Sequence, residues 1–250
     1  MAESERRPTV VADDISVTYR VFATGKREQD GGSLLRRRPA VRRSRAVHAL
    51  RNISFVAHEG DAIGVVGTNG SGKSTLMRAI AGLTVPTSGA IYADGDPALL
   101  GVNAALINDL SGERNVILGG LALGMTPEEV RRRYDEIVEF AGLGDFMDLP
   151  MRTYSSGMSA RLRFAIAASV THRVLLIDEA LAVGDATFKR RSEKRIKELR
   201  DAAGTVFLVS HSMRTIKETC NRTLWVEQGE LRMDGPTEEV VTEYWNHVTS

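Results

Sequence analysis

The sequence predicts an α/β fold built on a mostly parallel β-sheet, on the strength of three observations. A glycine-rich loop at residues 67–75 directly follows a short apolar run, Asp61–Val66. Two further runs, Val174–Ile177 and Val206–Val209, are continuously apolar, as is typical of strands buried on both faces of a parallel sheet. Helical stretches separate these runs, and such alternation indicates an α/β sheet fold.

The other elements can be placed in order along the chain. Strands are expected at Val10–Val11, Ile15–Tyr19 and Ile53–Val56, and a helix from Lys73 to Ala81 that stops at Gly82. Near the end, Thr223–Glu227, a Gln228-Gly229 turn and Glu230–Met233 suggest a hairpin, followed by a helix-like stretch from Thr237 to Trp245.

One helix is marked at both ends. Thr126 is placed as its N-cap, Pro127 at the first helical position and Glu129 at the third, which together form a capping box. Its apolar face comprises Val130, Tyr134, Ile137, Val138 and Ala141, and Gly142 ends it.

Composition sets wide limits. The chain has 250 residues, 42% of them hydrophobic and 26% charged, with a net charge of +1, which suits an ordinary globular protein. Its apolar stretch Val116–Met125 has ten residues, whereas a membrane span needs about 20. The first residues lack the apolar core of a secretory signal, and the single cysteine, Cys220, suits a reducing compartment. We therefore expect a soluble cytoplasmic protein.

The charge gathers in one segment. The segment from Lys26 to Arg45 contains eight basic residues and only two acidic ones. It also contains Gly31-Gly32-Ser33 and Pro39, which break regular secondary structure. Residues 20–46 are interpreted as an exposed basic insertion. It is either a solvated loop or a surface for anionic lipid headgroups, where each basic residue contributes about 1 kcal/mol. Nucleic acid is a third option, but the run has no aromatic residue to stack on bases.

The glycine-rich loop matches the pattern G-x-x-x-x-G-K-[ST] of a nucleotide-binding phosphate loop, in the required position between a strand and a helix. Its residues are Gly67, Thr68, Asn69, Gly70, Ser71, Gly72, Lys73, Ser74 and Thr75. The glycines let backbone N–H groups point at phosphate oxygens, and the helix N-terminus adds partial positive charge. Lys73 is expected to reach the β- and γ-phosphates and Ser74 to bind Mg²⁺. The class of phosphate-loop protein is still open at this point.

Three polar side chains follow the apolar strands. Asp178 and Glu179 come directly after Val174–Ile177, and His211 follows the strand at 205–210. The carboxyl ends of strands are where such sheets place ligands. Asp178 is expected in the Mg²⁺ shell, Glu179 beside the attacking water and His211 near the γ-phosphate.

A further segment narrows the class. Tyr154-Ser155-Ser156-Gly157-Met158 precedes Asp178 and opens a helix rich in small residues. It resembles the signature motif of ABC-type ATPases, usually Leu-Ser-Gly-Gly-Gln, in a degenerate form. The order of motifs over residues 9 to 235 is also that of the family, with Ala182–Asp185 at the D-loop, His211 at the switch and Tyr19 where an aromatic stacks on adenine. The resemblance implies a phosphate-loop NTPase of ABC type, with an antiparallel β subdomain and a helical subdomain that carries the signature.

Within that superfamily, the motif sequences are similar to those of the ATP-binding subunits of Wzt-type exporters of polysaccharide, O-antigen and teichoic acid. The similar segments are Tyr-Ser-Ser-Gly-Met, Asp-Glu-Ala-Leu-Ala-Val-Gly-Asp, Leu-Ser-Gly-Glu-Arg-Asn (110–115) and the insertion after Tyr19. The Arg-rich and Ala-rich composition hints at an actinobacterial exporter of cell-wall galactan.

One departure concerns a glutamine. Family members usually carry a Gln between the phosphate loop and the signature, where it ligates Mg²⁺ and contacts the membrane subunit. The only glutamines here are Gln29 and Gln228. The vacancy falls near Val102 or Asn103, and the Asn103 amide is the candidate substitute.

The resemblance implies a transport motor. Two copies would sandwich two ATP molecules, each held by the phosphate loop of one copy and by Ser155, Ser156, Gly157 and Met158 of the other, with Mg²⁺ as cofactor. The homodimer would sit on two copies of a polytopic membrane permease, at the cytoplasmic face of the membrane. Nucleic acid is not expected as a partner. The alternative is a soluble ABC-type ATPase that acts on nucleic acid or ribosomes, but residues 75–154 lack the long coiled coil usual in such proteins.

The expected organisation is a single ABC ATPase domain over residues 1–250. It comprises the basic insertion at 20–46, a helical subdomain at about 104–170 and a short C-terminal helix at 236–250, without a carbohydrate-binding domain.

Overall fold

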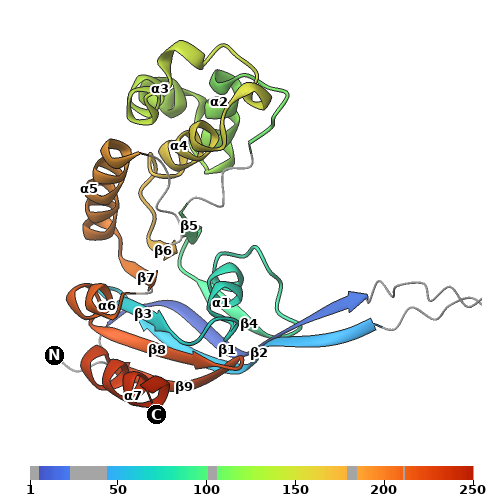
Figure 1. The fold of residues 1–250 in the computed structure, drawn as a ribbon, viewed down its shortest axis with the longest axis vertical. Coiled ribbons are helices and arrows are strands. Elements are labelled where there is room, and N and C mark those ends of the chain that lie inside the picture. Colours follow the sequence, from blue (N-terminus) through green and yellow to red (C-terminus); the bar gives the residue numbers. More distant parts are fainter. Residues whose placement is uncertain (1–5, 23–43, 101–105, 179–184, 211, 250) are drawn as a thin grey trace, which may run out of the picture.

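The computed structural model describes residues 6–22, 44–100, 106–178, 185–210 and 212–249. Two sheets lie at one end of the molecule, and a group of three helices lies at the other (Figure 1). These helices are α2 (Gly112–Ala122), α3 (Pro127–Ala141) and α4 (Ser156–Ala167). No helix in the described ranges has the length and apolar character needed to span a membrane.

The central sheet has the strand order β5–β6–β7–β3–β8–β9 in the described part of the chain. Its strands are β5 (Ala98–Leu99), β6 (Val174–Asp178), β7 (Thr205–Val209), β3 (Ala62–Val66), β8 (Arg222–Glu227) and β9 (Glu230–Pro236). The first five run parallel, and β9 returns antiparallel to β8 through a hairpin. The side chains of β7 are buried along its whole length. The predicted mostly parallel sheet with buried central strands is confirmed.

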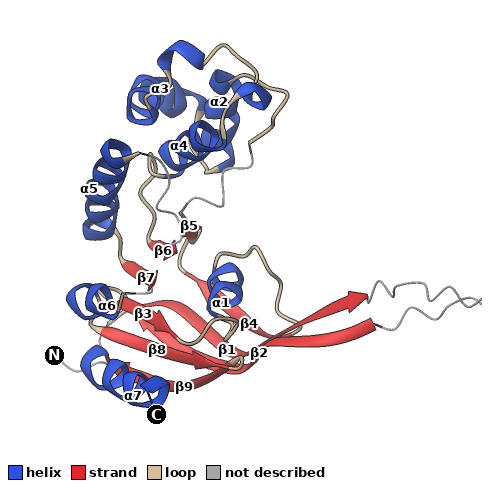
Figure 2. Ribbon diagram, viewed as in Figure 1, coloured by secondary structure: helices blue, strands red, loops and turns tan. Residues whose placement is uncertain are grey.

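The second sheet is antiparallel, in the order β2–β1–β4. Its strands are β1 (Pro8–Phe22), β2 (Ser44–His58) and β4 (Ser88–Ala93). The β1–β2 pairing runs from Pro8 opposite His58 to Phe22 opposite Ser44, and its far end projects as a two-stranded ribbon (Figure 2). A basic insertion is expected at residues 20–46, but residues 20–22 belong to β1 and 44–46 to β2. Its residues 23–43 are outside the described ranges.

Helix α1 (Lys73–Ile80) contributes to a core that both sheets share. Phe55 of β2 and Phe207 of β7 meet edge to face there, with ring centroids 5.9 Å apart. Helices α5 (Ala186–Ala202), α6 (Met213–Thr219) and α7 (Thr237–Thr249) belong to a second cluster, which also includes residues of β6 and β7. The central sheet is thus covered on both faces, as its apolar strands require.

Helices α2, α3 and α4 have a third cluster of their own, formed around Val116, Ile137 and Leu162. Short 3₁₀ turns at Gly144–Phe146 and Met151–Thr153 connect α3 to α4. Sequence reasoning used Val116–Met125 only to exclude a membrane span, yet much of this stretch forms α2. Gly119 and Gly120 weaken a helix intrinsically, but added Cβ atoms would lie 2.9 Å from Ile166 and 2.7 Å from Val130. Close helix packing therefore outweighs local propensity.

Short sequence signals correctly predicted where several helices and turns begin or end. The Thr126–Glu129 capping box is present in both directions, and Gly142 ends α3 in the left-handed conformation with φ 64°. Gln228 and Gly229 also have positive φ, 51° and 84°, as a two-residue hairpin requires. Helix α1 ends at Ile80, one residue earlier than expected, whereas α7 continues past Trp245 to Thr249.

Candidate nucleotide-binding site

The phosphate loop connects the buried strand β3 to helix α1. Gly67, Gly70 and Gly72 have φ of 148°, 81° and 114°, a region that side chains with a Cβ rarely adopt. These glycines turn the backbone tightly ahead of Lys73, the first residue of α1. The loop therefore presents N–H groups at a helix N-terminus, which is an arrangement suited to phosphate.

Lys73 points back over this loop. Its Nζ donates hydrogen bonds to the carbonyl oxygens of Gly67 and Thr68, at 2.7 and 2.8 Å. Burial lowers the pKa of Lys73 below its ordinary value, while the charges of Glu227 and Asp178 act in the opposite direction. The lysine is thus held by neutral carbonyl groups at the mouth of the loop, where it can turn to a phosphate oxygen.

A cavity of about 320 Å³ lies against the loop. It is lined by Val47, His48, Ala49, Asn69, Gly70, Gly72, Lys73, Ser74, Thr75, Asp178 and Val209. Asp178 ends β6 and pairs with Val209 of β7, so the parallel sheet brings it beside the loop, more than 100 residues away in sequence. Sequence reasoning placed Ser74 and Asp178 at one metal, and both line this cavity.

The donors fit Mg²⁺, which prefers carboxylate and hydroxyl oxygens and takes further ligands from water and substrate phosphates. In the described ranges no three or more His, Cys, Asp or Glu side chains form a metal-binding group. Asn103, Glu179 and His211, which sequence reasoning assigned to the same site, lie outside the described residues.

Strand β2 supplies one wall of the cavity, which sequence reasoning missed. Val47, His48 and Ala49 carry no motif that marks them, and they reach the loop only because β2 lies along it. An added Cβ on Gly72 would lie 2.6 Å from the carbonyl oxygen of Ala49. Tyr19 pairs with Val47 across the β1–β2 ladder, and both are exposed. The predicted adenine-stacking residue is therefore next to a residue of the cavity wall.

The signature residues form the start of helix α4. The hydroxyl of Ser155 caps it by accepting from the N–H of Met158 at 3.2 Å, and the Tyr154 hydroxyl donates to the carbonyl oxygen of Phe146 at 2.7 Å. Ser155 and Ser156 are exposed. Residues 155–158 are not among those that line the phosphate cavity. Among the described residues, the predicted signature is therefore not part of the cavity at the phosphate loop.

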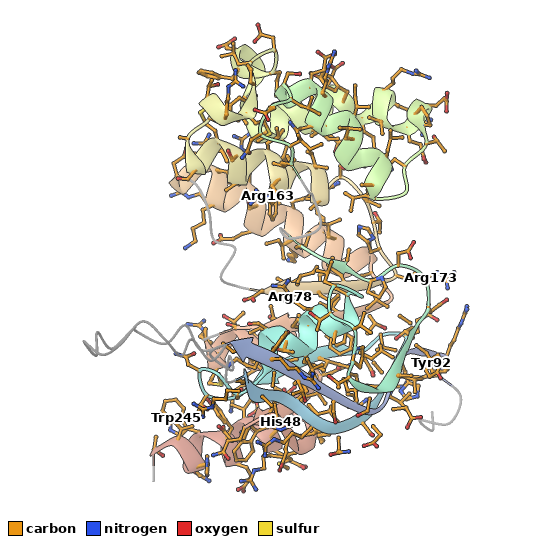
Figure 3. The ribbon with its side chains drawn as sticks, turned by 90° about the vertical axis from the view of Figure 1, so that its right-hand side faces the viewer. His48, Arg78, Tyr92, Arg163, Arg173 and Trp245 are labelled. Atoms are coloured by element: carbon orange, nitrogen blue, oxygen red, sulfur yellow. The ribbon has the colours of Figure 1, made fainter. Side chains whose placement is uncertain are left out.

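Asp185, which is predicted to belong to the D-loop, caps helix α5. Its Oδ1 accepts from the N–H groups of Thr187 and Phe188 at 3.0 and 2.9 Å. Arg163 of α4 lies at the end of the helical group that is nearer to the sheets (Figure 3). Asp185 is the first described residue after Glu179 in the sequence.

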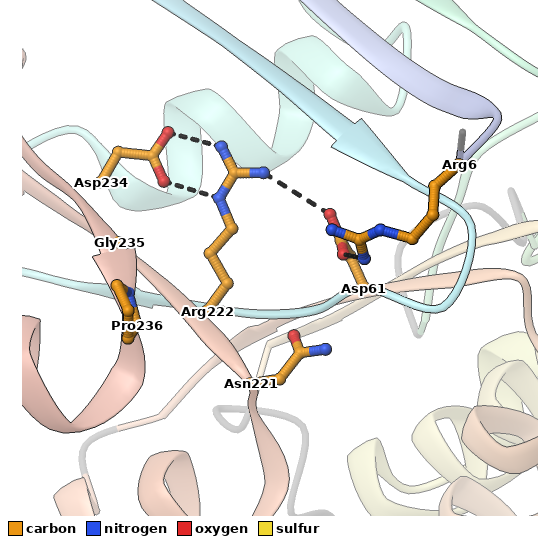
Figure 4. A pocket seen from close by; sticks show the side chains of 7 residues that line it. All are labelled: Arg6, Asp61, Asn221, Arg222, Asp234, Gly235 and Pro236. Carbon is orange, nitrogen blue, oxygen red and sulfur yellow. Dashed lines mark hydrogen bonds and ion pairs between the residues drawn. The ribbon is translucent and has the colours of Figure 1, made fainter. Parts of the chain in front are cut away.

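Another cavity of about 320 Å³ lies at the amino ends of β3 and β8 (Figure 4). Asp61, with 2% of its side chain exposed, pairs with Arg6 at 2.6 Å and with Arg222 at 3.5 Å. Arg222 also binds Asp234 through two hydrogen bonds of 2.6 Å. These charges satisfy one another, so the cluster is interpreted as a structural tie between strands.

The family model described as "ABC transporter" matches residues 50–182. The teichoic acids export ATP-binding protein of Staphylococcus epidermidis is 39% identical, over 94% of this chain and 88% of that protein. The protein of the same name from Lactococcus lactis is 46% identical over 78% of this chain. An O-antigen export system ATP-binding protein of Myxococcus xanthus is 42% identical over 84% of this chain. The chain spans only 42% and 48% of the length of these last two relatives.

Solved structures agree on the fold. An ATP-binding subunit of an ABC transporter has a TM-score of 0.69 at 21% identity, covering 95% of this chain and 93% of that one. The dimeric cassette MJ0796 bound to ADP and Pi has a TM-score of 0.65 at 22% identity, covering 91% and 98%. At these identities the likeness concerns the fold alone.

Proposed function

Because this chain belongs to the ABC transporter family of ATP-binding proteins, we propose that it is the ATP-hydrolysing motor of an exporter that moves a lipid-linked polysaccharide across the cytoplasmic membrane. The observation that best supports ATP binding is that Lys73, Ser74 and Asp178 line the same cavity. The polysaccharide cargo rests on the names of the relatives, which are teichoic acid and O-antigen export proteins. An exporter of cell-wall galactan is a narrower form of the same proposal.

Each residue of the site has a proposed task. The loop N–H groups and Lys73 bind the β- and γ-phosphates, and Tyr19 stacks on the adenine. Ser74 and Asp178 hold Mg²⁺, which neutralises charge on the phosphates, and Asn103 takes the place of the usual glutamine. Glu179 orients and polarises the attacking water, and His211 hydrogen-bonds the γ-phosphate.

The signature is proposed to act on a second copy of the chain. Ser155 and Ser156 are exposed and, with Gly157 and Met158, remain outside their own phosphate cavity. The N-terminus of α4 directs N–H groups outward, where a γ-phosphate held by the partner would be stabilised. ATP then joins the two copies, and its hydrolysis lets them separate.

The membrane partner is proposed to be a polytopic permease in two copies, with this protein peripheral at the cytoplasmic face. The 101–115 region is the proposed contact, and three side chains of the adjoining helix α2 support it. Ile117, Leu118 and Leu121 are 40–41% exposed, and exposed apolar side chains that gather on one surface are typical of interaction sites. The Arg36–Arg45 run is proposed to face anionic lipid.

The proposed organisation is one ATPase domain with a helical subdomain at about 104–170. The separate apolar cluster of α2, α3 and α4 supports that division.

The change Glu179→Gln tests the motor. General-base assistance contributes about 10²- to 10⁴-fold, so we expect hydrolysis to fall by that range while ATP binding persists and an ATP-bound dimer accumulates on size-exclusion chromatography. Glu193→Gln, an exposed residue on α5, is the matched control and should keep the wild-type rate. Wild-type turnover by Glu179→Gln would remove Glu179 from the mechanism.

Co-purification tests the exporter. The chain expressed with its membrane subunit should be recovered with it, with ATPase activity that does not respond to added RNA. RNA-stimulated activity without a membrane partner would favour the nucleic-acid alternative.

A further inference from the structure

The end of β8 and the turn that follows it, residues 226–229 and here called the 226–229 turn, contact the phosphate loop at three points. An added Cβ on Gly67 would lie only 2.0 Å from the carbonyl oxygen of Val226. The Thr68 hydroxyl donates to Oε1 of Glu227 at 2.5 Å. The N–H of Gly229 donates to the carbonyl oxygen of Ser71 at 2.8 Å. The 226–229 turn therefore contacts both halves of the loop, although it carries no nucleotide-binding motif.

Glu227 is unusual among the buried groups. It is 8% exposed, and Asp61 is the other buried carboxylate in the described ranges. Asp61 has two arginine partners, whereas Glu227 forms no ion pair within 4.0 Å among the described residues. It accepts instead from the Thr68 hydroxyl and from Nε1 of Trp225, at 2.5 and 3.4 Å. Burying a carboxylate that forms no close ion pair is costly, so the presence of Glu227 beside the phosphate loop calls for a reason.

The lowered pKa of Glu227 agrees with a carboxylate that is ionised when it accepts these hydrogen bonds. Burial by itself would raise the pKa of Glu227, but the hydrogen bonds from Thr68 and Trp225, together with the positive charge that His247 can carry, outweigh it and lower the pKa. A carboxylate that is charged at neutral pH accepts a stronger hydrogen bond than a neutral group does.

Helix α7 fixes the other side of Glu227. The Trp225 ring meets Tyr244 edge to face, with centroids 5.6 Å apart, and lies 5.1 Å from the His247 ring. Helix α7 packs along β8 and β9 in the structure (Figure 1), while Trp245 on its other side is 58% exposed (Figure 3). Helix α7 thus packs against Trp225, which in turn donates a hydrogen bond to Glu227.

We propose that Glu227 is a positioning residue for the phosphate loop, which it holds in its phosphate-binding shape through the Thr68 hydroxyl. The link to the site is direct, because the Thr68 carbonyl oxygen is one of the two acceptors of Lys73 Nζ. Glu227 sets Thr68, and Thr68 sets the point from which the lysine reaches the phosphates. The inference rests on the proposed ATP-binding function.

The test measures binding of a fluorescent ATP analogue and steady-state ATP hydrolysis with the purified full chain. We expect Glu227→Ala to raise the dissociation constant and the KM for ATP about tenfold, with kcat changed less than about threefold. Glu227→Gln keeps an oxygen that accepts from Thr68, so both constants should stay within about threefold of wild type. Thr68→Val removes the hydroxyl at nearly constant volume and should match Glu227→Ala.

A double variant tests whether Glu227 acts on nucleotide binding through Thr68. If Glu227 acts through Thr68, then Thr68→Val with Glu227→Ala should weaken binding no more than either change alone. Effects that multiply would overturn the proposal, as would wild-type affinity in a folded Glu227→Ala variant. Thermal melting without nucleotide reports folding, and Thr68→Val alone still tests the contact if Glu227→Ala does not fold.

Glu230→Ala is the matched control. Glu230 lies on the same hairpin with 56% of its side chain exposed, and its variant should bind the analogue as wild type does. A wild-type chain that binds no ATP analogue would defeat the proposed function itself. Binding that is normal in wild type and unchanged in the Glu227 variants would defeat only this inference.

Discussion

Arg161 of the signature helix donates a hydrogen bond from Nη2 to Oδ2 of Asp185, with a length of 2.6 Å. The other oxygen of the same carboxylate caps helix α5, and the Arg161 guanidinium lies 5.6 Å from the centre of the Phe188 ring. One carboxylate therefore joins the helix that opens with Ser155–Met158 to the segment that follows Asp178. The Asp185 carboxylate thereby ties helix α4 to the amino end of α5.

Asp185→Asn tests this tie through its pH dependence. The N–H of Phe188, together with Arg161, lowers the pKa of Asp185 below its ordinary value of 3.8. A lowered folded-state pKa stabilises the fold above the unfolded pKa, and that contribution is lost as pH falls through the folded value. Asparagine still caps a helix but lacks the charge. We expect a lower melting temperature than wild type above about pH 5 and a shrinking difference below pH 4.

Asp145→Asn is the control for that measurement, since Asp145 is an exposed carboxylate in the α3–α4 connection. Its melting curves should follow wild type at every pH. A pH-independent deficit in Asp185→Asn would mean that the lost charge does not act through the folded-state pKa.

Gly157→Asp separates the monomer from the dimer. An added Cβ on Gly157 has Ser155 Oγ, at 3.8 Å, as its nearest heavy atom, so the chain itself accommodates a side chain there. A carboxylate would repel a partner-bound phosphate at the helix N-terminus. We expect ATPase activity to fall by at least about a hundredfold, with melting temperature and monomer nucleotide affinity unchanged.

Gly144→Asp serves as the matched change, because Gly144 also has open space around its Cβ position, and it should retain activity. Equal losses of affinity and activity in Gly157→Asp would place Gly157 in the site of its own subunit.

Asn115 is expected to stabilise the fold of the helical group formed by α2, α3 and α4. It is buried, with 1% of its surface exposed. The side-chain amide oxygen accepts a hydrogen bond from the N–H of Ile107, and the amide nitrogen donates to the carbonyl oxygens of Ile107, Leu110 and Ser111. Asn115→Ala leaves these backbone groups unpaired and should lower the free energy of unfolding by about 2–4 kcal/mol. Urea denaturation measures this, and the exposed Asn108→Ala should be near neutral.

The Arg36–Arg45 run gives a test of membrane attachment. Replacing its six arginines with Gln should reduce binding to anionic liposomes at low salt by tenfold or more, since each basic residue contributes about 1 kcal/mol near such a surface. Basal ATPase activity should not change. The difference should shrink with salt, because the Debye length is about 10 Å at 0.1 M.

A control for charge alone replaces four exposed basic residues of α5 with Gln, namely Lys189, Arg190, Lys194 and Lys197. These should leave liposome binding intact. Equal binding by the Arg36–Arg45 variant and wild type would make the insertion a solvated loop.

Predictions from the sequence succeeded where the determinants are local. The Thr126–Glu129 capping box, the Gly142 stop and the Gln228-Gly229 turn each depend on a few neighbouring residues, and each is present. Helix α2 was missed because its two glycines oppose a helix locally, and only packing against Ile166 and Val130 makes them favourable. Asn115 was noticed as part of a family resemblance, but its burial and its four bonds depend on how the 107–111 segment folds back.

The sequence by itself determined the phosphate loop, the apolar strands and the position of Asp178 at a strand end, because glycine spacing and continuous apolar runs are properties of short segments. Tertiary structure decided what surrounds them. Strand β2 became a wall of the cavity, the 226–229 turn reached Gly67, Thr68 and Ser71, and Arg161 met Asp185. The physical reason is that the order of strands in a sheet joins residues far apart in the chain, and no local pattern encodes which strands will be neighbours.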